Sequence, residues 1–156
     1  NVDLPTLVDG KFENLNTKEE FAGKRVILFS LPGAFTPTCS NNQLPGFEEK
    51  FTEFQEKGID AIYCLSVNDS FVMNAWFELK GIVNVKPLAD GNGEFTHKIG
   101  AECKKSNVGF GYRSWRYAVV LNDGLVESVF IEEGFQDNIE SDPYEASSPE
   151  NVLSNL

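Results

Sequence analysis

The run Pro32–Cys39, with the sequence PGAFTPTC, places a cysteine where its thiolate form is favoured. It follows the apolar segment Arg25–Ser30, which has the length of a strand buried on both faces. Thr36 is a good helix N-cap and Pro37 a good first helical residue, so we expect Cys39 in the first turn of a helix. Free backbone N–H groups and the helix dipole stabilise an anion there. Because the thiolate is the nucleophilic form, the run predicts a nucleophilic cysteine rather than an inert core residue.

Two other residues near Cys39 add to this prediction. The hydroxyl of Thr36, three residues earlier, can reach over the first helical turn toward the sulfur or its substrate. Pro45 falls inside the same helical stretch, where a proline breaks or kinks a helix. A helix weakened at that point would let an oxidised Cys39 move outward to meet a reductant.

Strand-like segments are distributed along the chain. Ala61–Val67 is a second apolar run of strand length. Two apolar segments, Tyr117–Leu121 and Leu125–Ile131, flank an Asn-Asp-Gly turn and predict a β-hairpin. The stretch Leu7–Leu15 carries an Asp-Gly dipeptide between apolar residues and predicts a smaller hairpin near the N-terminus.

Three helices are predicted between and after these strands. Phenylalanines at helical spacing give the segment Gly46–Lys57 one apolar face. Asn68-Asp69-Ser70 offers cap residues for a second helix that ends at Gly81, and Ser148-Pro149 opens a short C-terminal helix. The order of elements predicts an α/β protein with a thioredoxin-like fold. We expect a central mixed sheet flanked by helices and an N-terminal β-hairpin, in a single domain of residues 1–156.

The composition excludes several classes of function. A net charge of -11 over 156 residues argues against binding to nucleic acid or to an anionic membrane surface. No apolar run is long enough to cross a bilayer. Three widely spaced cysteines do not form a disulfide framework and fit a reducing compartment, which predicts a cytoplasmic protein. The chain starts at Asn1 rather than Met, so removal of an organelle targeting segment stays open. One histidine, His97, and no Cys-x-x-Cys motif argue against a zinc site, and His97 is expected to face solvent.

The sequence around Cys39 resembles the peroxidatic motif of peroxiredoxins, P-x-x-x-T-x-x-C, in the extended form of the type II or peroxiredoxin-five subfamily. The similarity extends over nearly the whole chain, from residue 3 to 156. Further matching segments are Leu44-Pro45-Gly46-Phe47, Ser66-Val67-Asn68-Asp69, Phe71-Val72-Met73, Ala75-Trp76 and Arg113-Ser114-Trp115-Arg116-Tyr117. The resemblance implies a thiol peroxidase that reduces hydrogen peroxide and organic hydroperoxides.

The resemblance also implies roles for four residues. Cys39 attacks the O–O bond, Thr36 orients the peroxide through its hydroxyl, and Pro32 shields the pocket. Arg116 matches the distant arginine that stabilises the thiolate and the charge that develops on oxygen, a role that suits a fixed cation with several donors. Arg113 is the alternative for this position, and the Arg-Tyr pair favours Arg116.

One position departs from a common pattern of the subfamily. Gln43 stands where many members have a histidine. Glutamine forms hydrogen bonds but does not titrate near neutral pH, so we expect peroxidase activity without pH tuning by that histidine.

Peroxide attack leaves a sulfenic acid that a second thiol must reduce. Some relatives carry a resolving cysteine after the C-terminal hairpin, whereas this chain has no cysteine from Leu125 onward. We therefore predict a one-cysteine cycle in which glutathione, glutaredoxin or thioredoxin reduces Cys39, without a metal, flavin or haem cofactor.

The other two cysteines receive different predictions. Cys64 lies in the middle of a predicted strand and is expected to be buried and structural. Cys103, in the polar stretch Glu102–Lys105, is expected to be exposed, with two lysines that lower the pKa of its thiol. A thioredoxin-dependent two-cysteine cycle through Cys103 is therefore the alternative to the one-cysteine cycle.

The resemblance further implies a homodimer whose interface includes loops near Phe47 and the region after Asp69. Two other functions compete with the peroxidase. One is a redox sensor or relay that passes the oxidation of Cys39 to another protein, and the other is a thioredoxin-like binding module without catalysis. The joint presence of Thr36, Cys39 and Arg116 argues against the binding module, which needs none of them.

Overall fold

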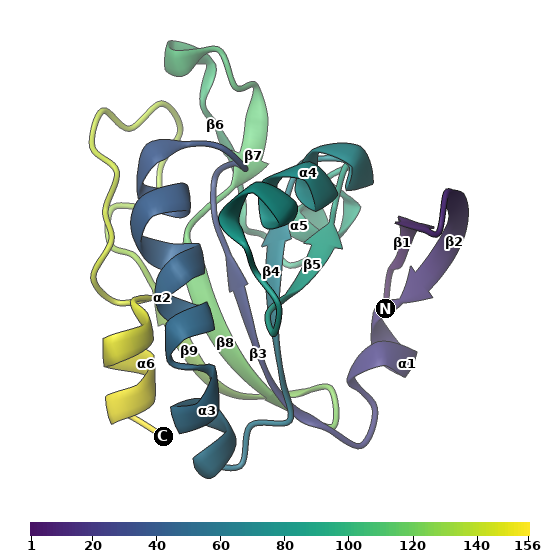
Figure 1. Ribbon diagram of the computed structural model, residues 1–156. Helices are drawn as coiled ribbons and strands as arrows, with labels where there is room; N and C mark the ends of the chain where they lie inside the picture. Colours follow the sequence, from purple (N-terminus) through teal and green to yellow (C-terminus); the bar gives the residue numbers. More distant parts are fainter.

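A five-stranded mixed sheet forms the centre of the molecule in a computed structural model that describes residues 1–156 (Figure 1). The strand order is β5-β4-β3-β8-β9. The strands are β3 (Arg25–Ser30), β4 (Ala61–Ser66), β5 (Lys86–Ala89), β8 (Tyr117–Asn122) and β9 (Leu125–Ile131). β3, β4 and β5 run parallel, whereas β8 pairs antiparallel with both β3 and β9. The prediction of parallel strands followed by a hairpin is confirmed.

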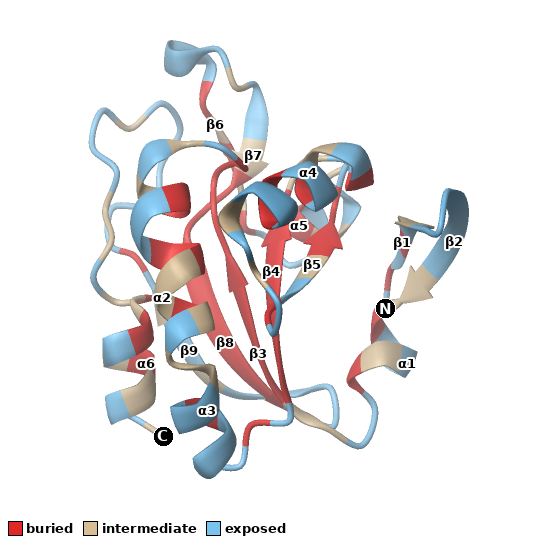
Figure 2. Cartoon of the chain, in the orientation of Figure 1, coloured by how far each residue is buried: buried red, intermediate tan, exposed pale blue.

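Burial explains why the central strands are continuously apolar. All six residues of β4 are buried, and β3 is buried from its second residue onward (Figure 2). Because helices cover both faces of these strands, an alternating pattern would leave polar side chains without partners. The β8–β9 hairpin turns through Asp123 and Gly124, which have φ values of 51° and 76°. Asp-Gly accepts this pair of positive φ angles, so the predicted hairpin forms where the sequence places it.

Helices cover the two faces of the sheet unequally. The helices are α1 (Thr17–Phe21), α2 (Leu44–Glu49), α3 (Phe51–Glu56), α4 (Ser70–Lys80), α5 (Glu94–Lys98) and α6 (Pro149–Ser154). The larger core cluster joins α2, α3, α4 and α6 to one face of the sheet, and Phe47, Phe54 and Trp76 are among its members. The smaller cluster lies on the other face and includes Phe21 of α1, with Phe95 of α5 packed against it. None of these helices combines the length and the apolar character that crossing a bilayer requires.

Two small hairpins lie outside the central sheet. β1 (Asp3–Val8) and β2 (Lys11–Asn16) form the N-terminal hairpin, which is longer than the predicted stretch 7–15 but turns at the predicted Asp-Gly pair. β6 (Glu102–Lys104) and β7 (Tyr112–Ser114) form a second hairpin and enclose a 3-10 turn at Ser106–Val108. The sequence patterns did not predict β5 or this second hairpin.

Local caps set the ends of two helices as predicted. The Asp69 side chain accepts a hydrogen bond from the N–H of Val72 at 3.0 Å, and α4 ends at Gly81, whose φ is 64°. The hydroxyl of Ser148 accepts a hydrogen bond from the N–H of Asn151 at 3.2 Å, which starts α6.

The prediction of one continuous helix over Gly46–Lys57 is wrong. The structure has two helices, α2 and α3, which meet at Lys50 with φ -93° and ψ 8°. In a straight helix, residues seven apart are separated by about 10 Å along the axis. Phe47 and Phe54, on either side of Lys50, lean toward each other and stack with ring centroids 5.6 Å apart.

We predict that Gly46→Ala destabilises the protein by about 1–2 kcal/mol, because α6 packs directly on this glycine. A Cβ at position 46 would lie 2.8 Å from Cγ of Pro149, whose ring cannot move away as a flexible chain would. On its own, the change from Gly to Ala within a helix should stabilise it by about 1 kcal/mol. Denaturant unfolding measures the effect.

The control for this prediction repeats the substitution in a Pro149→Ala background. With the ring removed, Gly46→Ala should cost little or become stabilising. An equal cost in both backgrounds would contradict the packing argument.

Candidate active site

Cys39 lies at the start of a wide helical turn. The helix begins at Pro37, as predicted, and changes to a π turn over Cys39–Gln43 before it continues as α2. The N–H of Leu44 binds the carbonyl of Cys39, five residues back. The predicted break near Pro45 therefore takes the form of a π turn, a feature that is frequent at functional sites. The Cys39 side chain is only 1% exposed.

Arg116 brings a cation directly to this cysteine. Its side chain is 2% exposed, and its Nη1 lies 3.5 Å from Sγ of Cys39. Nη1 also donates to Oε1 of Gln43 at 2.5 Å. Nη2 donates to Oδ1 of Asp142 at 2.6 Å, and Nε donates to the carbonyl oxygen of Pro143 at 3.1 Å. Every nitrogen of the guanidinium is therefore held in place.

The charge on Arg116 is maintained despite its burial. Burial lowers the pKa of Arg116, but the Cys39 thiolate and Asp142 act in the opposite direction and raise it above its ordinary value. Arg113 differs, because burial lowers its pKa and the thiolate only partly compensates. Arg113 makes no hydrogen bond to Cys39. Its Nη1 donates to the carbonyl oxygen of Pro32 at 3.1 Å. The structure therefore places Arg116 at the sulfur, whereas Arg113 binds the backbone of the loop before Cys39, at Pro32.

The loop before Cys39 is held in a strained conformation. Phe35 has a φ of 67°, which is unfavourable for a residue with a side chain. The amide of Asn68 fixes this conformation, since its oxygen accepts hydrogen bonds from the N–H of Ala34 at 3.0 Å and from the hydroxyl of Ser66 at 2.6 Å. A Cβ on Gly33 would lie 2.7 Å from Nη1 of Arg113, so a larger residue at position 33 would require that guanidinium to shift.

The hydroxyl of Thr36 is oriented by the same loop. It donates to the carbonyl oxygen of Gly33 at 2.6 Å. Since the single hydroxyl proton is used in this bond, the lone pairs of the oxygen are available to accept a hydrogen bond. Thr36 precedes the first helical residue, as predicted, and its carbonyl accepts from the N–H of Ser40.

A polar cavity of about 360 Å³ opens beside the loop. Pro32, Thr36 and Arg116 all line it, together with Lys105 and Asp142. Three of the four residues singled out by the sequence thus share one cavity, and the fourth, Cys39, lies 3.5 Å from the guanidinium of Arg116.

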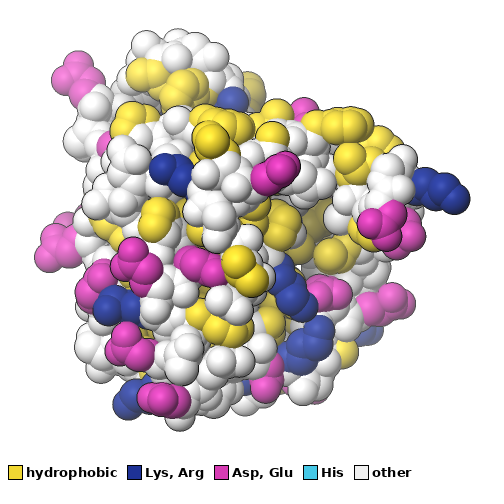
Figure 3. All heavy atoms as spheres, viewed as in Figure 1, with side chains coloured by type: hydrophobic (Ala, Val, Ile, Leu, Met, Phe, Trp, Pro, Cys, Tyr) yellow, Lys and Arg dark blue, Asp and Glu magenta, His cyan; other side chains and the backbone are white.

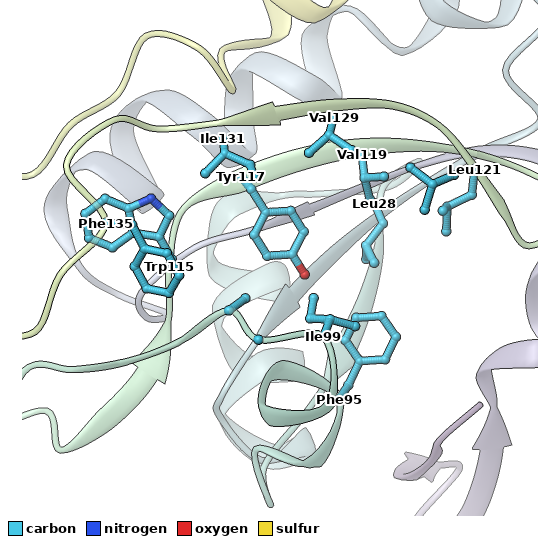
Figure 4. Close-up of a pocket in the computed structure, with 13 residues that line it drawn as sticks. Leu28, Phe95, Ile99, Trp115, Tyr117, Val119, Leu121, Val129, Ile131 and Phe135 are labelled. Atoms are coloured by element: carbon cyan, nitrogen blue, oxygen red, sulfur yellow. The ribbon is translucent and has the colours of Figure 1, made fainter.

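A second cavity of about 270 Å³ has a different character (Figure 4). It lies between β8, β9 and α5, where Phe95 and Ile99 face Tyr117 and Val129 in the close-up. Its lining is almost entirely hydrophobic and includes none of Pro32, Thr36, Cys39 and Arg116. The polar cavity is therefore the candidate active site.

The comparisons with known proteins agree with this geometry. Residues 3–146 match the family model described as Redoxin. The chain is 60% identical over 146 residues to peroxiredoxin y4vD of Sinorhizobium fredii, a match that covers 94% of this chain and 78% of the relative. It is 55% identical over 146 residues to peroxiredoxin sll1621 of Synechocystis, which covers 94% of this chain and 77% of that relative.

The chain belongs to the peroxiredoxins. Peroxiredoxins are thiol peroxidases, and the activity of this chain is that of a peroxidase and oxidoreductase.

Solved peroxiredoxin structures confirm the thioredoxin-like fold. The Plasmodium falciparum antioxidant protein, described as a 1-Cys peroxiredoxin, superposes with a TM-score of 0.95 at 38% identity, covering 100% of this chain and 95% of that one. Reduced Prx3 of Vibrio vulnificus in complex with hydrogen peroxide superposes with a TM-score of 0.90 at 38% identity, covering 99% and 93%.

The prediction that Cys103 is exposed is wrong. Its side chain is 1% exposed, because residue 103 lies in the middle of β6, where it pairs with Arg113 of β7. Burial raises the pKa of the Cys103 thiol, and Lys105 only partly opposes this effect. The neighbouring lysines suggested exposure from the sequence, but the β6–β7 pairing turns the cysteine inward.

Cys64 is buried in β4, as predicted. Burial, followed by the nearby Cys39 thiolate, raises the pKa of the Cys64 thiol well above its ordinary value, although Arg116 acts in the opposite direction. All three cysteines are free thiols. His97 is exposed and lies 3.6 Å from Glu102 rather than beside Cys39.

The long loop after β9 contributes to the site in a way that the sequence analysis did not find. The loop supplies Asp142 and Pro143 to the guanidinium of Arg116, and the ring of Tyr144 lies 5.6 Å from it. A loop of this length inside a compact domain usually has a function, which was the available signal. The sequence offers no sign of which loop residues reach the site.

We predict that Cys64 and Cys103 react slowly with thiol reagents in the native protein. A Cys39→Ser variant treated with a chromogenic disulfide reagent at neutral pH should show much less than one fast-reacting thiol, because burial keeps both remaining thiols protonated and out of reach. The same protein unfolded in guanidinium should release both thiols at once. One full equivalent that reacts in the native protein at the rate of free cysteine, and maps to Cys103, would contradict the buried position.

Proposed function

We propose that Cys39 is the peroxidatic cysteine and that Arg116 is its electrostatic partner. The observation that carries this proposal is the buried guanidinium 3.5 Å from Sγ. The thiolate attacks one peroxide oxygen, an S–O bond forms and the O–O bond breaks. The second oxygen leaves with the electron pair and takes up a proton as water or an alcohol, while the sulfur is oxidised to a sulfenic acid. A fixed cation at this point stabilises both the thiolate and the charge on the leaving oxygen.

Thr36 and Pro32 complete the proposed site. The hydroxyl of Thr36, with its own proton held by Gly33, accepts a hydrogen bond from the O–H of the peroxide and aims the peroxide at sulfur. Pro32 is buried at the wall of the cavity and limits the access of water to it. The substrates proposed are hydrogen peroxide and organic hydroperoxides.

We further propose a one-cysteine cycle with an external thiol. A first thiol attacks the sulfenic sulfur and releases water, and a second thiol displaces Cys39 from the mixed disulfide. The burial of Cys64 and Cys103 supports this cycle, because neither thiol reaches the solvent or the cavity. A closely similar fold is described as a 1-Cys peroxiredoxin in Plasmodium falciparum. Glutathione with glutaredoxin is the proposed reductant, thioredoxin the second candidate, and no metal, flavin or haem takes part.

We predict that Cys39→Ser abolishes peroxide consumption and that Cys103→Ser leaves glutathione-supported turnover unchanged. The measurement is steady-state peroxide consumption, with glutathione plus glutaredoxin and with thioredoxin in parallel. Full activity of Cys39→Ser would exclude the proposed nucleophile.

Two other outcomes have distinct meanings. Loss of turnover in Cys103→Ser, with Cys39 still oxidised by peroxide, would establish Cys103 as the resolving cysteine. Oxidation of wild-type Cys39 for a single turnover with no recycling by either reductant would indicate a sensor instead of a peroxidase.

We also propose that the chain forms a homodimer through the exposed apolar face that includes Phe71. Phe71 is 62% exposed and meets Phe12 edge-to-face with ring centroids 5.8 Å apart. Phe35, whose ring centroid lies 6.5 Å from that of Trp76 in α4, is exposed as well. Figure 3 shows hydrophobic atoms gathered along the upper edge of the molecule. With a net charge of -11, two copies repel each other, so an apolar contact is needed. Phe47 is fully buried in the core and takes no part itself.

We predict that Phe71→Glu converts the dimer to a monomer, because a charge in a desolvated contact is strongly unfavourable. Sedimentation velocity should give twice the chain mass of 17.4 kDa for the wild type and a single chain mass for the variant. Leu125→Glu is the matched control, since Leu125 is 74% exposed on β9 and should not affect the mass. Monomeric wild-type protein, or dissociation by the control alone, would contradict the proposed face.

A further inference from the structure

Glu132 is a buried carboxylate with no cationic partner. It follows β9, is 3% exposed, and takes part in none of the salt bridges. A buried charge is costly unless hydrogen bonds compensate it. Its oxygens accept from the N–H groups of Glu145 at 2.6 Å, of Ala146 at 2.6 Å and of Ser147 at 3.2 Å. The hydroxyl of Ser147 donates as well, at 3.2 Å. The carboxylate therefore accepts hydrogen bonds from three successive backbone N–H groups of one loop.

This loop also holds the cation of the active site. The residues just before the amides are Asp142 and Pro143, which bind Nη2 and Nε of Arg116, and Tyr144, whose ring lies 5.6 Å from the guanidinium. No helix or strand occurs between β9 and α6, so the loop has no regular hydrogen bonding of its own. Its position opposite Arg116 depends on the contacts made by its side chains and by Glu132.

The backbone of Glu132 forms hydrogen bonds with the main chain of Arg116 and with the side chain of Trp115. Its N–H donates to the carbonyl oxygen of Arg116 at 3.2 Å, and its carbonyl oxygen accepts from Nε1 of Trp115 at 2.8 Å. One residue thus connects the segment just before β8, which carries the arginine, with the loop that binds its guanidinium.

We propose that Glu132 is the positioning residue for Arg116, which it holds against Cys39 through the loop of residues 142–147. The proposal rests on the function proposed above for Arg116. Glu132 touches neither the sulfur nor the cavity, and it acts only by fixing where Asp142 and Pro143 present their oxygens. Small displacements of a group that stabilises charge reduce the rate steeply, which is why such a residue matters for the reaction.

The test is Glu132→Gln, which keeps the shape of the side chain but turns an N–H₂ group toward backbone N–H donors. The loop should move and Arg116 should lose its place at the sulfur. We expect the second-order rate constant for hydrogen peroxide, measured by stopped flow, to fall about tenfold or more. The pH midpoint of thiolate formation, followed by ultraviolet absorbance, should move upward because the thiolate loses its cation. Glu133→Gln is the matched control, since Glu133 is the exposed neighbour and both quantities should stay at the wild-type values.

A double-mutant cycle with Arg116→Gln separates positioning from a general loss of stability. If Glu132 acts through Arg116, Glu132→Gln should slow the Arg116→Gln protein by much less than it slows the wild type. Equal fold-losses in both backgrounds, or an unchanged rate in Glu132→Gln, would overturn the proposal. A normal rate in Arg116→Gln alone would instead refute the function proposed for Arg116, so the two failures are distinguishable.

Asp142→Asn covers the case in which Glu132→Gln does not fold. Asp142 is partly exposed, and this change removes only the charge with which the loop binds Nη2 of Arg116. The rate and the thiolate midpoint should change in the same directions as for Glu132→Gln, and wild-type values for both would overturn the proposal.

Discussion

The placement of one buried guanidinium governs the architecture of this peroxiredoxin. A buried cation needs acceptors on every side, and Arg116 finds them in two separate parts of the chain. The π turn supplies the sulfur of Cys39 and the amide oxygen of Gln43, and the loop after β9 supplies Asp142 and Pro143. Each of these segments lacks a regular helix or strand geometry of its own at the contact. The guanidinium therefore orders the segments that bind it, and they in turn determine where its charge lies.

Sheet register explains why the arginine and the cysteine meet at all. Ser30, the last residue of β3, pairs with Tyr117, the first residue of β8. The segment after β3 and the residue before β8 must therefore leave the sheet at the same edge, and these are the Cys39 loop and Arg116. Antiparallel neighbours bring the end of one strand to the start of the other. Cys39 and Arg116 therefore meet although 77 residues separate them in the sequence. The fold supplies the coarse placement, and the side-chain contacts of the guanidinium supply the fine one.

Local signals predicted most of the fold, and their limits explain what they missed. Turns and caps such as Asp123-Gly124, Asp69 and Gly81 are determined by neighbouring residues, so the sequence was sufficient to place them. Cys39, Thr36, Pro32 and Arg116 could be selected from the motif, and the structure brings them to one place. Cys103 was misjudged because its burial comes from pairing with β7, which local charge does not reveal. Glu132 could not be found, since a glutamate that binds backbone amides has the same sequence signature as an exposed one.

Burial of Cys39 imposes a further constraint on the proposed peroxidase cycle. Cys39 is 1% exposed, and the polar cavity is lined by Arg116, whose Nη1 lies 3.5 Å from Sγ, but not by Cys39 itself. The sulfur of a peptide or protein thiol therefore does not reach Cys39 in this conformation. The proposed reduction of a Cys39 sulfenic acid by an external thiol therefore requires the segment around Cys39 to open. The π turn over residues 39–43 is the natural place, because its hydrogen bonds reach back five residues and Pro45 contributes no N–H to the next turn. The contacts of Arg116 with Cys39 and Gln43 oppose that opening. In the proposed cycle, oxidation replaces the thiolate of Cys39 by a neutral sulfenic acid. This change removes part of the attraction that keeps the turn closed, so the first proposed step favours the opening that the second requires.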